Sequence, residues 1–215
     1  MSELTRPLLL VAIVLALPIV PLLVWGELFQ SSLARWQETP PSRTALALGV
    51  TCILASDILL PVPSGPVTTF AGAQLGLVPG MAFAWLGMML GAVAAFAVVR
   101  RYGAAMALRL TTQEDMDRLA AGCRRHAVAM LIATRPVPVL AEASVLLAGL
   151  GGCSWGRFLP AVAISNLVVA AIWTWLGHYA RQHDWLPLAF ALSLLVPLAL
   201  MLGFRRRVVK QPDAD

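Results

Sequence analysis

Three ionisable residues lie beside two copies of a Pro-Val-Pro tripeptide in strongly apolar sequence. Asp57 precedes the first copy (Pro61–Pro63), whereas Arg135 and Glu142 lie on either side of the second (Pro136–Pro138). A charged residue at the centre of a membrane helix costs about 2.5–3.5 kcal/mol on an insertion scale, so such residues tend to pair. An arginine can hold one or two carboxylates, or bind a phosphate instead. The three residues predict a charged transport site or, alternatively, a buried ion network that only fastens two segments together.

Other polar side chains near the tripeptides extend this candidate site. Ser64, Thr68 and Thr69 follow the first tripeptide and can offer hydroxyls to a headgroup or an ion, with back-bonding to helix carbonyls as the alternative. Asn166 lies in the middle of an apolar run, where either a hydrogen bond to another helix or a contact with substrate would satisfy it. The prolines stop helices because they lack a backbone N–H donor. We therefore expect the tips of two broken helices, and the pathway between them, to be formed by Pro61, Pro63, Pro136 and Pro138.

The composition is that of an integral membrane protein. Of 215 residues, 59% are hydrophobic and only 13% are charged, whereas soluble domains carry about 25% charged residues. Several apolar runs approach or exceed the roughly 20 residues that a membrane helix needs. The net charge of +5 arises largely from arginines beside these runs, where they act as topology signals and contact anionic headgroups. No nucleic-acid motif accompanies them, so we expect an all-α membrane protein without a nucleic-acid partner.

The apolar runs and their breaks predict a single membrane domain over residues 1–215. Transmembrane helices are expected over 8–25, 78–99, 158–178 and 186–204, re-entrant hairpins over 44–77 and 127–150, an amphipathic cytoplasmic helix over 104–126, and a basic cytoplasmic tail over 205–215. Within 104–126, Thr112-x-x-Asp115 has the form of a capping box, and apolar residues follow it at helical spacing. A solvated connector is the equal alternative for that segment.

The distribution of arginines decides how the two broken segments enter the membrane. If the N-terminus and the basic tail are cytoplasmic, a single crossing by 44–77 would place the arginines from Arg100 to Arg125 outside, against the positive-inside rule. A segment that enters and leaves on the same side keeps these arginines inside. Likewise, a single crossing by 127–150 would place the basic tail outside, whereas a hairpin keeps it inside. We therefore expect two re-entrant hairpins from opposite faces, each followed by a transmembrane helix, as in the inverted repeats of secondary transporters.

Patterns for metal binding and catalysis are not found in the sequence. The three cysteines are scattered, without C-x-x-C and without histidines at ligand spacing. An intramembrane aspartyl protease needs two aspartates, but only Asp57 lies in a membrane segment, and neither G-x-S-x-G nor H-E-x-x-H occurs. We expect no metal, no cofactor and no enzymatic activity.

A series of short motifs follows in order between about residues 44 and 179. They are Asp57, Pro61–Ser64, Ala71–Gly72, Arg135–Pro138, Ala148–Gly149, Asn166, Trp173 and Gly177–Tyr179. This series resembles the DedA family, also described as the VTT-domain or SNARE-associated Golgi protein family. The resemblance implies a multi-pass bacterial inner-membrane protein with two opposed re-entrant hairpins. It also implies movement of undecaprenyl phosphate or other lipids, a link to proton motive force, and scramblase activity in eukaryotic relatives.

The resemblance assigns roles to two residues and shows two departures. The membrane acid of the family corresponds best to Asp57, and its first arginine corresponds to Arg135. Where the family often has a glutamate after the first tripeptide, this chain has Gly65, and where it has a second arginine, this chain has Ala141–Glu142. The candidate phosphate pocket is therefore less cationic than the family pattern.

We expect a transporter of lipid headgroups, either a flippase or a scramblase. Its partners would be membrane lipids with an anionic headgroup or a polyprenyl phosphate. In this hypothesis Arg135 binds the phosphate, while Asp57 and Glu142 titrate or gate, which would allow coupling to protons. Two alternatives stay open: a proton-coupled transporter of small ions or drugs, and a non-transporting scaffold for envelope assembly. Small-residue pairs such as Gly87-x-x-x-Gly91 are weak evidence for a homodimer.

Overall fold

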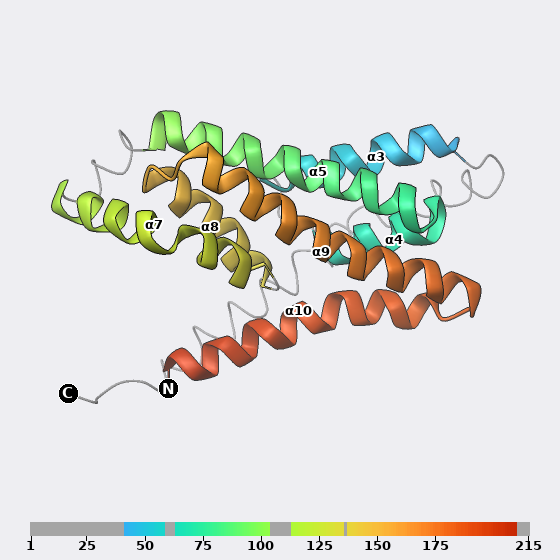
Figure 1. Cartoon of the computed structure of the whole chain (residues 1–215). Coiled ribbons are helices and arrows are strands. Elements are labelled where there is room, and N and C mark those ends of the chain that lie inside the picture. The colour runs from blue at the N-terminus through green and yellow to red at the C-terminus, as the bar shows by residue number, and fades with distance from the viewer. Residues whose placement is uncertain (1–40, 59–62, 104–112, 136, 210–215) are drawn as a thin grey trace, which may run out of the picture. The chain divides into compact units, whose positions relative to one another are not determined.

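Helices make up nearly all of the described chain. A computed structural model describes residues 41–58, 63–103, 113–135 and 137–209 (Figure 1). The elements are α3 (Arg43–Ala55), the 3-10 turn η1 (Ser56–Ile58), α4 (Ser64–Leu75), α5 (Leu77–Val98), the π-helical turn η2 (Val99–Gly103), α7 (Gln113–Ala133), α8 (Pro138–Leu150), α9 (Trp155–Gln182) and α10 (Leu186–Val209). No strand occurs among these residues, so the expectation of an all-α protein is confirmed for this part of the chain.

Two helices are long and apolar enough to cross a membrane. α5 with its π-helical turn has 27 residues, and α9 has 28. At a rise of about 1.5 Å per residue, either helix exceeds the hydrocarbon thickness of about 30 Å. They cover the ranges 78–99 and 158–178, where spans were expected. The apolar part of α10 is shorter, and the span expected over 8–25 lies outside the described residues.

Helix α3 packs along the first half of α5 through small residues. Gly87 lies against Thr51, since a Cβ at Gly87 would stand 2.7 Å from the Thr51 carbonyl oxygen. One turn further on, a Cβ at Gly91 would stand 3.1 Å from the carbonyl oxygen of Leu54. Residue numbers rise along both helices from the first contact to the second, so α3 and α5 run in the same direction. The Gly87-x-x-x-Gly91 pair thus serves a contact within the chain, and it no longer argues for a homodimer.

Helix α4 runs in the opposite direction to α3 and α5. The chain reverses between α4 and α5 at Gly76, whose φ of 94° favours glycine. After this reversal Gly80 of α5 packs closely on the backbone of Ala71 in α4. Pro63 is the N-cap residue of α4, so the broken segment 44–77 consists of two antiparallel helices with a proline at the break.

Helices α7 and α8 form a second antiparallel pair. Thr134 Oγ1, just after α7, donates to Ser144 Oγ of α8 over 2.9 Å. Farther from the turn, the Cys123 thiol of α7 contacts the Leu147 carbonyl oxygen of α8 at 3.4 Å. Pro138 is the first residue of α8, a position that proline favours because its missing N–H would be unpaired there anyway.

The boundary expected at residues 126–127 is corrected by this arrangement. We expected a surface helix over 104–126 and a separate hairpin arm from Ala127, but α7 is continuous from Gln113 to Ala133. Cys123, Ala127 and Leu131 are all buried. Their spacing of four places them on one face of a helix. No glycine or proline lies between Cys123 and Leu131, so nothing breaks the helix at the expected boundary.

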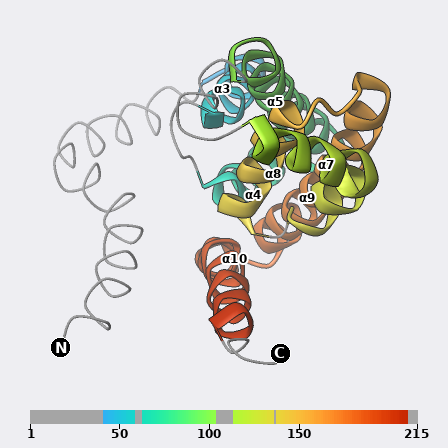
Figure 2. The ribbon, with the colours of Figure 1, turned by 90° about the vertical axis from the view of Figure 1, so that its left-hand side faces the viewer.

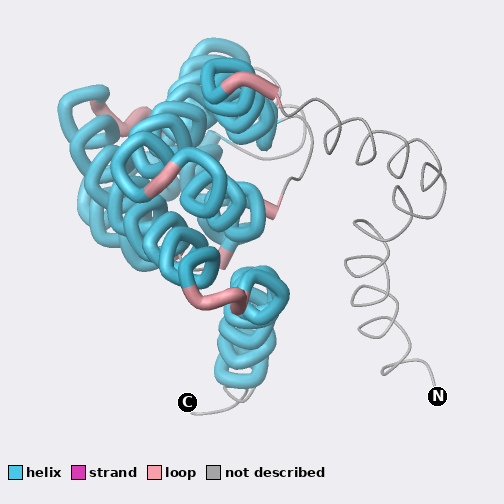
Figure 3. The backbone as a smooth tube through the Cα atoms, turned by 90° about the vertical axis from the view of Figure 1, so that its right-hand side faces the viewer, coloured by secondary structure: helices cyan, strands magenta, loops and turns pink. Residues whose placement is uncertain are grey.

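The two helical pairs flank the long helices α5 and α9, which run antiparallel. Phe96 of α5 stacks on Phe158 of α9, with 3.9 Å between ring centroids, whereas Met89 of α5 contacts Asn166 of α9. One core cluster joins α5 and α9 to α7 and α8, and another joins them to α3 and α4. The end-on view shows these helices gathered together (Figure 2). Figure 3 shows only helices and short loops, and no strand, among the described residues.

Candidate functional site

The turns of both helical pairs line one cavity beside α5 and α9. The cavity has a volume of about 120 Å³. Its polar lining residues come from different elements and are Asp57, Ser64, Arg135, Glu142 and Asn166. Its apolar wall includes Leu54, Met88, Val145, Leu146 and Val169. The structure thus brings together five of the residues that the sequence singled out, although they lie up to about a hundred positions apart.

Arg135 presents an unpaired edge of its guanidinium group at this cavity. It lies in the turn after α7, where its backbone N–H donates to the Ile132 carbonyl oxygen at 3.4 Å. Its side-chain atoms Nε and Nη2 are buried and have no hydrogen-bond partner among the described residues. Leaving a buried donor unpaired costs about 1–3 kcal/mol, and more for a charged group. Nε and Nη2 form one side of the planar fork, which is the arrangement that binds a carboxylate or phosphate with two parallel hydrogen bonds.

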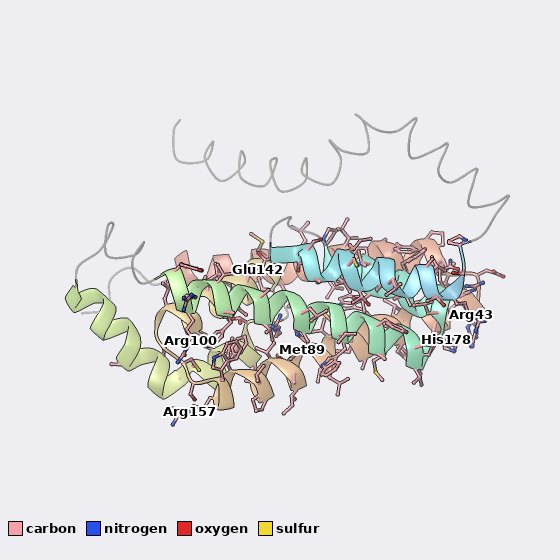
Figure 4. All side chains as sticks on the ribbon, turned by 90° about the horizontal axis from the view of Figure 1, so that it is seen from above. Arg43, Met89, Arg100, Glu142, Arg157 and His178 are labelled. Atoms are coloured by element: carbon pink, nitrogen blue, oxygen red, sulfur yellow. The ribbon has the colours of Figure 1, made fainter. Side chains whose placement is uncertain are left out.

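The two carboxylates of the site lie within electrostatic range of this arginine. The charges of Asp57 and Glu142 both act on Arg135, and Asp57 also acts on Glu142. Asp57 is half-buried in η1, whereas the Glu142 side chain on α8 is exposed even though it lines the cavity. Glu142 therefore stands where the cavity meets the outside of the helical bundle. Figure 4 shows it between Arg100 and Arg43 along the helices, closer to Arg100.

Asn166 supplies a buried amide to the same cavity. Its side chain is fully buried, at 0% exposure, and its Nδ2 donates to the Met89 sulfur at 3.6 Å. This is the contact between helices that the sequence offered as one explanation for the residue. Its Oδ1 is buried without a partner among the described residues. Asn166 thus adds an unpaired acceptor to the cavity that Arg135 also lines.

The remaining candidate residues do not all reach the cavity. Thr68 and Thr69 are fully buried, and they do not belong to the cavity lining. Their hydroxyls have no partner among the described residues, so they neither bond back to the helix nor face the cavity. Pro63 and Pro138 mark the starts of α4 and α8. Pro61 and Pro136 lie outside the described residues.

The space for the cavity depends on small residues that the sequence did not single out as site residues. Gly91, Ala92 and Ala95 of α5 line it, and their small side chains leave room between the turns. A stripe of small residues along one face of an apolar helix is the signal for such a space. The same signal also marks helix packing sites, so the sequence alone does not distinguish the two.

Long apolar helices and a charged cavity between broken helices are typical of a helical membrane protein. The comparison with known families agrees: the VTT domain matches residues 62–179, which is more than half of the chain. The chain therefore belongs to the VTT-domain family, whose domain is that of the DedA and SNARE-associated Golgi proteins. No curated protein and no solved structure matches it. The matched range includes Arg135, Glu142 and Asn166, whereas Asp57 precedes it.

Membership in this family agrees with the class of protein expected from the sequence. The family is membrane-associated and is regarded as transporter-like and non-enzymatic.

Proposed function

We propose that the protein moves phosphate-bearing lipid headgroups from one membrane leaflet to the other, as a flippase or scramblase. The observation that carries this proposal is the buried, unpaired Nε–Nη2 edge of Arg135 at the cavity. A phosphate would accept two charge-assisted hydrogen bonds from this edge, and its bridging or terminal oxygens would still be free to approach Ser64. The proposed substrates are lipids with an anionic headgroup, including a polyprenyl phosphate.

The shape of the cavity agrees with a headgroup inside and acyl chains outside. A volume of about 120 Å³ holds several water molecules, since one water needs at least about 10–15 Å³ of such volume, so it accommodates a phosphate group. Glu142 and Leu146, which lie on successive turns of α8, line the cavity and are also exposed. This side of the cavity offers a lateral path, along which lipid tails remain in the surrounding membrane.

The proposed architecture is an inverted repeat of two re-entrant hairpins. In support, α3–α4 and α7–α8 are each followed by a long apolar helix, and those helices, α5 and α9, run antiparallel. The turns of both pairs line the same cavity. Irregular backbone at membrane depth is tolerated only where protein or water shields it, and transport sites lie where two inverted repeats meet. We place the protein in a bacterial inner membrane with both termini cytoplasmic, following the distribution of its arginines.

In the proposed mechanism the carboxylates compete with the phosphate for Arg135. An ionised Asp57 or Glu142 attracts the guanidinium and repels a phosphate, whereas a protonated one does neither. Proton binding would therefore favour substrate binding, which provides a route to proton coupling. The same carboxylates would serve a transporter of small ions, and the small volume of the cavity is the observation that favours this second candidate.

The experiment is lipid transport in reconstituted vesicles. Fluorescent phospholipid and polyprenyl phosphate are incorporated on both leaflets, and a membrane-impermeant quencher reports how fast the inner pool becomes accessible. Arg135→Ala should abolish transport, and Arg135→Lys should retain only part of it, because lysine keeps the charge but not the fork. Arg101→Gln, at an exposed position in the turn η2, is the matched control and should transport normally.

Two results would contradict the proposal. Full lipid transport by Arg135→Ala would exclude the assigned role of the guanidinium. Movement of protons or small ions without any movement of lipid would favour the second candidate.

A further inference from the structure

A second pocket lies at the ends of α3, α4 and α9 and shares no lining residue with the central cavity. Its volume is about 400 Å³. The polar side chains that line it are Arg43, Gln74, His178, Arg181 and Gln182. No acidic side chain is among the described residues of its lining. Figure 4 shows Arg43 and His178 at the same end of the helices, opposite to Arg100 and Arg157.

Arg181 is held in place from one side only. Its Nη1 donates to the Ala73 carbonyl oxygen at 2.5 Å and to Gln74 Oε1 at 2.9 Å. These bonds tie the end of α9 to the end of α4, so the guanidinium is oriented before any ligand binds. They use a single nitrogen, and Nε and Nη2 make no hydrogen bond with the described residues. A preorganised fork with a free edge is suited to an oxyanion.

The other lining residues add donors and no competing negative charge. Arg43 is exposed at the start of α3 and makes no hydrogen bond or ion pair with the described residues. Gln182 Nε2 lies 3.0 Å from His178 Nε2. Two guanidinium groups and an imidazole therefore line a pocket that has no acid among its described residues. Oxyanions are the ligands that such a set of donors selects.

Exposed aromatic side chains place this pocket at the level of lipid headgroups. Trp175, Tyr179 and Trp185 are 55%, 39% and 56% exposed, and Tyr179 packs against both tryptophans. Two of them lie in the same last turns of α9 as His178 and Arg181. Tryptophan and tyrosine gather at the interface between membrane and water.

We propose that this pocket is a phosphate-binding site at one membrane face, separate from the central cavity. The phosphate is either that of a lipid headgroup or free inorganic phosphate. This site does not depend on the transport activity proposed above, because none of its residues lines the central cavity.

Direct binding to the purified full-length protein tests this site. The Arg135→Ala protein in maltoside micelles, which contain no phosphate, is titrated with dihexanoyl phosphatidic acid and, separately, with inorganic phosphate. We expect binding to persist in Arg135→Ala, because the central arginine is not involved. Adding Arg43→Gln or Arg181→Gln should weaken it about tenfold or more, the effect of losing one charged hydrogen-bonding partner. Adding Arg101→Gln should leave it unchanged.

The two probes distinguish the sources of the phosphate. Tighter binding of the lipid indicates a headgroup site, and equal binding indicates a site for free phosphate; either supports the proposal. Arg43 makes no hydrogen bond within the described chain, so Arg43→Gln tests the site even if Arg181→Gln disturbs the contact between α4 and α9. The proposal is overturned if Arg135→Ala binds neither probe, or if Arg43→Gln binds both as tightly as the Arg101→Gln control.

Discussion

Replacing Arg135 with methionine distinguishes two interpretations of this residue, as part of a ligand site or as part of a structural ion network. In a network, each buried charge is satisfied, and removing one partner of a buried pair costs about 3–5 kcal/mol. In the structure, however, Nε and Nη2 of Arg135 are buried without partners among the described residues. Methionine fills a similar volume and carries no donor. The two interpretations therefore predict opposite changes in stability.

The expected change can be worked out from the surroundings of Arg135. Two unpaired buried donors cost about 1–3 kcal/mol each, and Arg135→Met removes both. The attraction to Asp57 and Glu142 is lost as well, but Glu142 is exposed and Asp57 half-buried, so this loss is only about 0–1 kcal/mol per pair. At the centres of these ranges, we expect the free energy of unfolding to rise by about 3 kcal/mol, or roughly 6–12 °C in Tm at about 2–4 °C per kcal/mol for a chain of this size.

Thermal unfolding of the purified protein in detergent, followed by tryptophan fluorescence, measures this change. Arg100→Met is the matched comparison, because the Arg100 guanidinium donates to the Cys153 carbonyl oxygen and lies 5.7 Å from the Phe96 ring centroid. Because that arginine is paired, Arg100→Met should lower the free energy of unfolding by about 1.5–3 kcal/mol. A Tm for Arg135→Met that falls as far as that of Arg100→Met would refute the ligand-site interpretation. Lost transport together with a raised Tm is the expected result.

Three further substitutions test the packing that positions the site. Gly177→Ala would place a Cβ 1.9 Å from the Thr69 carbonyl oxygen and should lower stability by about 1–3 kcal/mol or more; Gly156→Ala, in the same helix with open space around it, should leave Tm unchanged or slightly raised. Thr69→Val should raise stability by about 1 kcal/mol, because it removes a buried hydroxyl without a described partner; a clear drop in Tm would reveal an undetected partner. Trp85→Phe removes the 2.9 Å bond from Nε1 to the Ala163 carbonyl oxygen and should cost about 0.5–1.5 kcal/mol by urea unfolding; no change would show that water replaces that bond.

The convergence of the charged residues was predictable, because burial in an apolar chain leaves charges few stable arrangements. Asp57, Arg135 and Glu142 stood out because an ionised side chain is energetically costly in a membrane segment, and all three line one cavity. Prolines likewise indicated where helices would begin again, as they do at Pro63 and Pro138. In both cases the energetic penalty is local, so the sequence displays it directly.

Features that depend on neighbouring helices were not predictable in the same way. The hydroxyl of Thr68 has the same chemistry in a cavity wall as in a packed interface, and only the position of α9 decides between them. The pocket that contains Arg43 and Arg181 joins residues from distant helices, and no motif connects them. The prediction that a surface helix ends at residue 126 was wrong, because the apolar face of α7 continues into the bundle.

The charge balance of the cavity connects the two functions proposed for it. Its described lining holds two carboxylates and one guanidinium, so it is formally negative when all three are ionised. A phosphate then meets net repulsion, even though the edge of Arg135 is oriented to receive it. Protonation of one carboxylate makes the lining neutral, and outward movement of the exposed Glu142 side chain has a similar effect because water screens its charge. In the proposed mechanism, anion binding and proton uptake are consequences of the same three side chains, so a lipid phosphate would enter together with a proton.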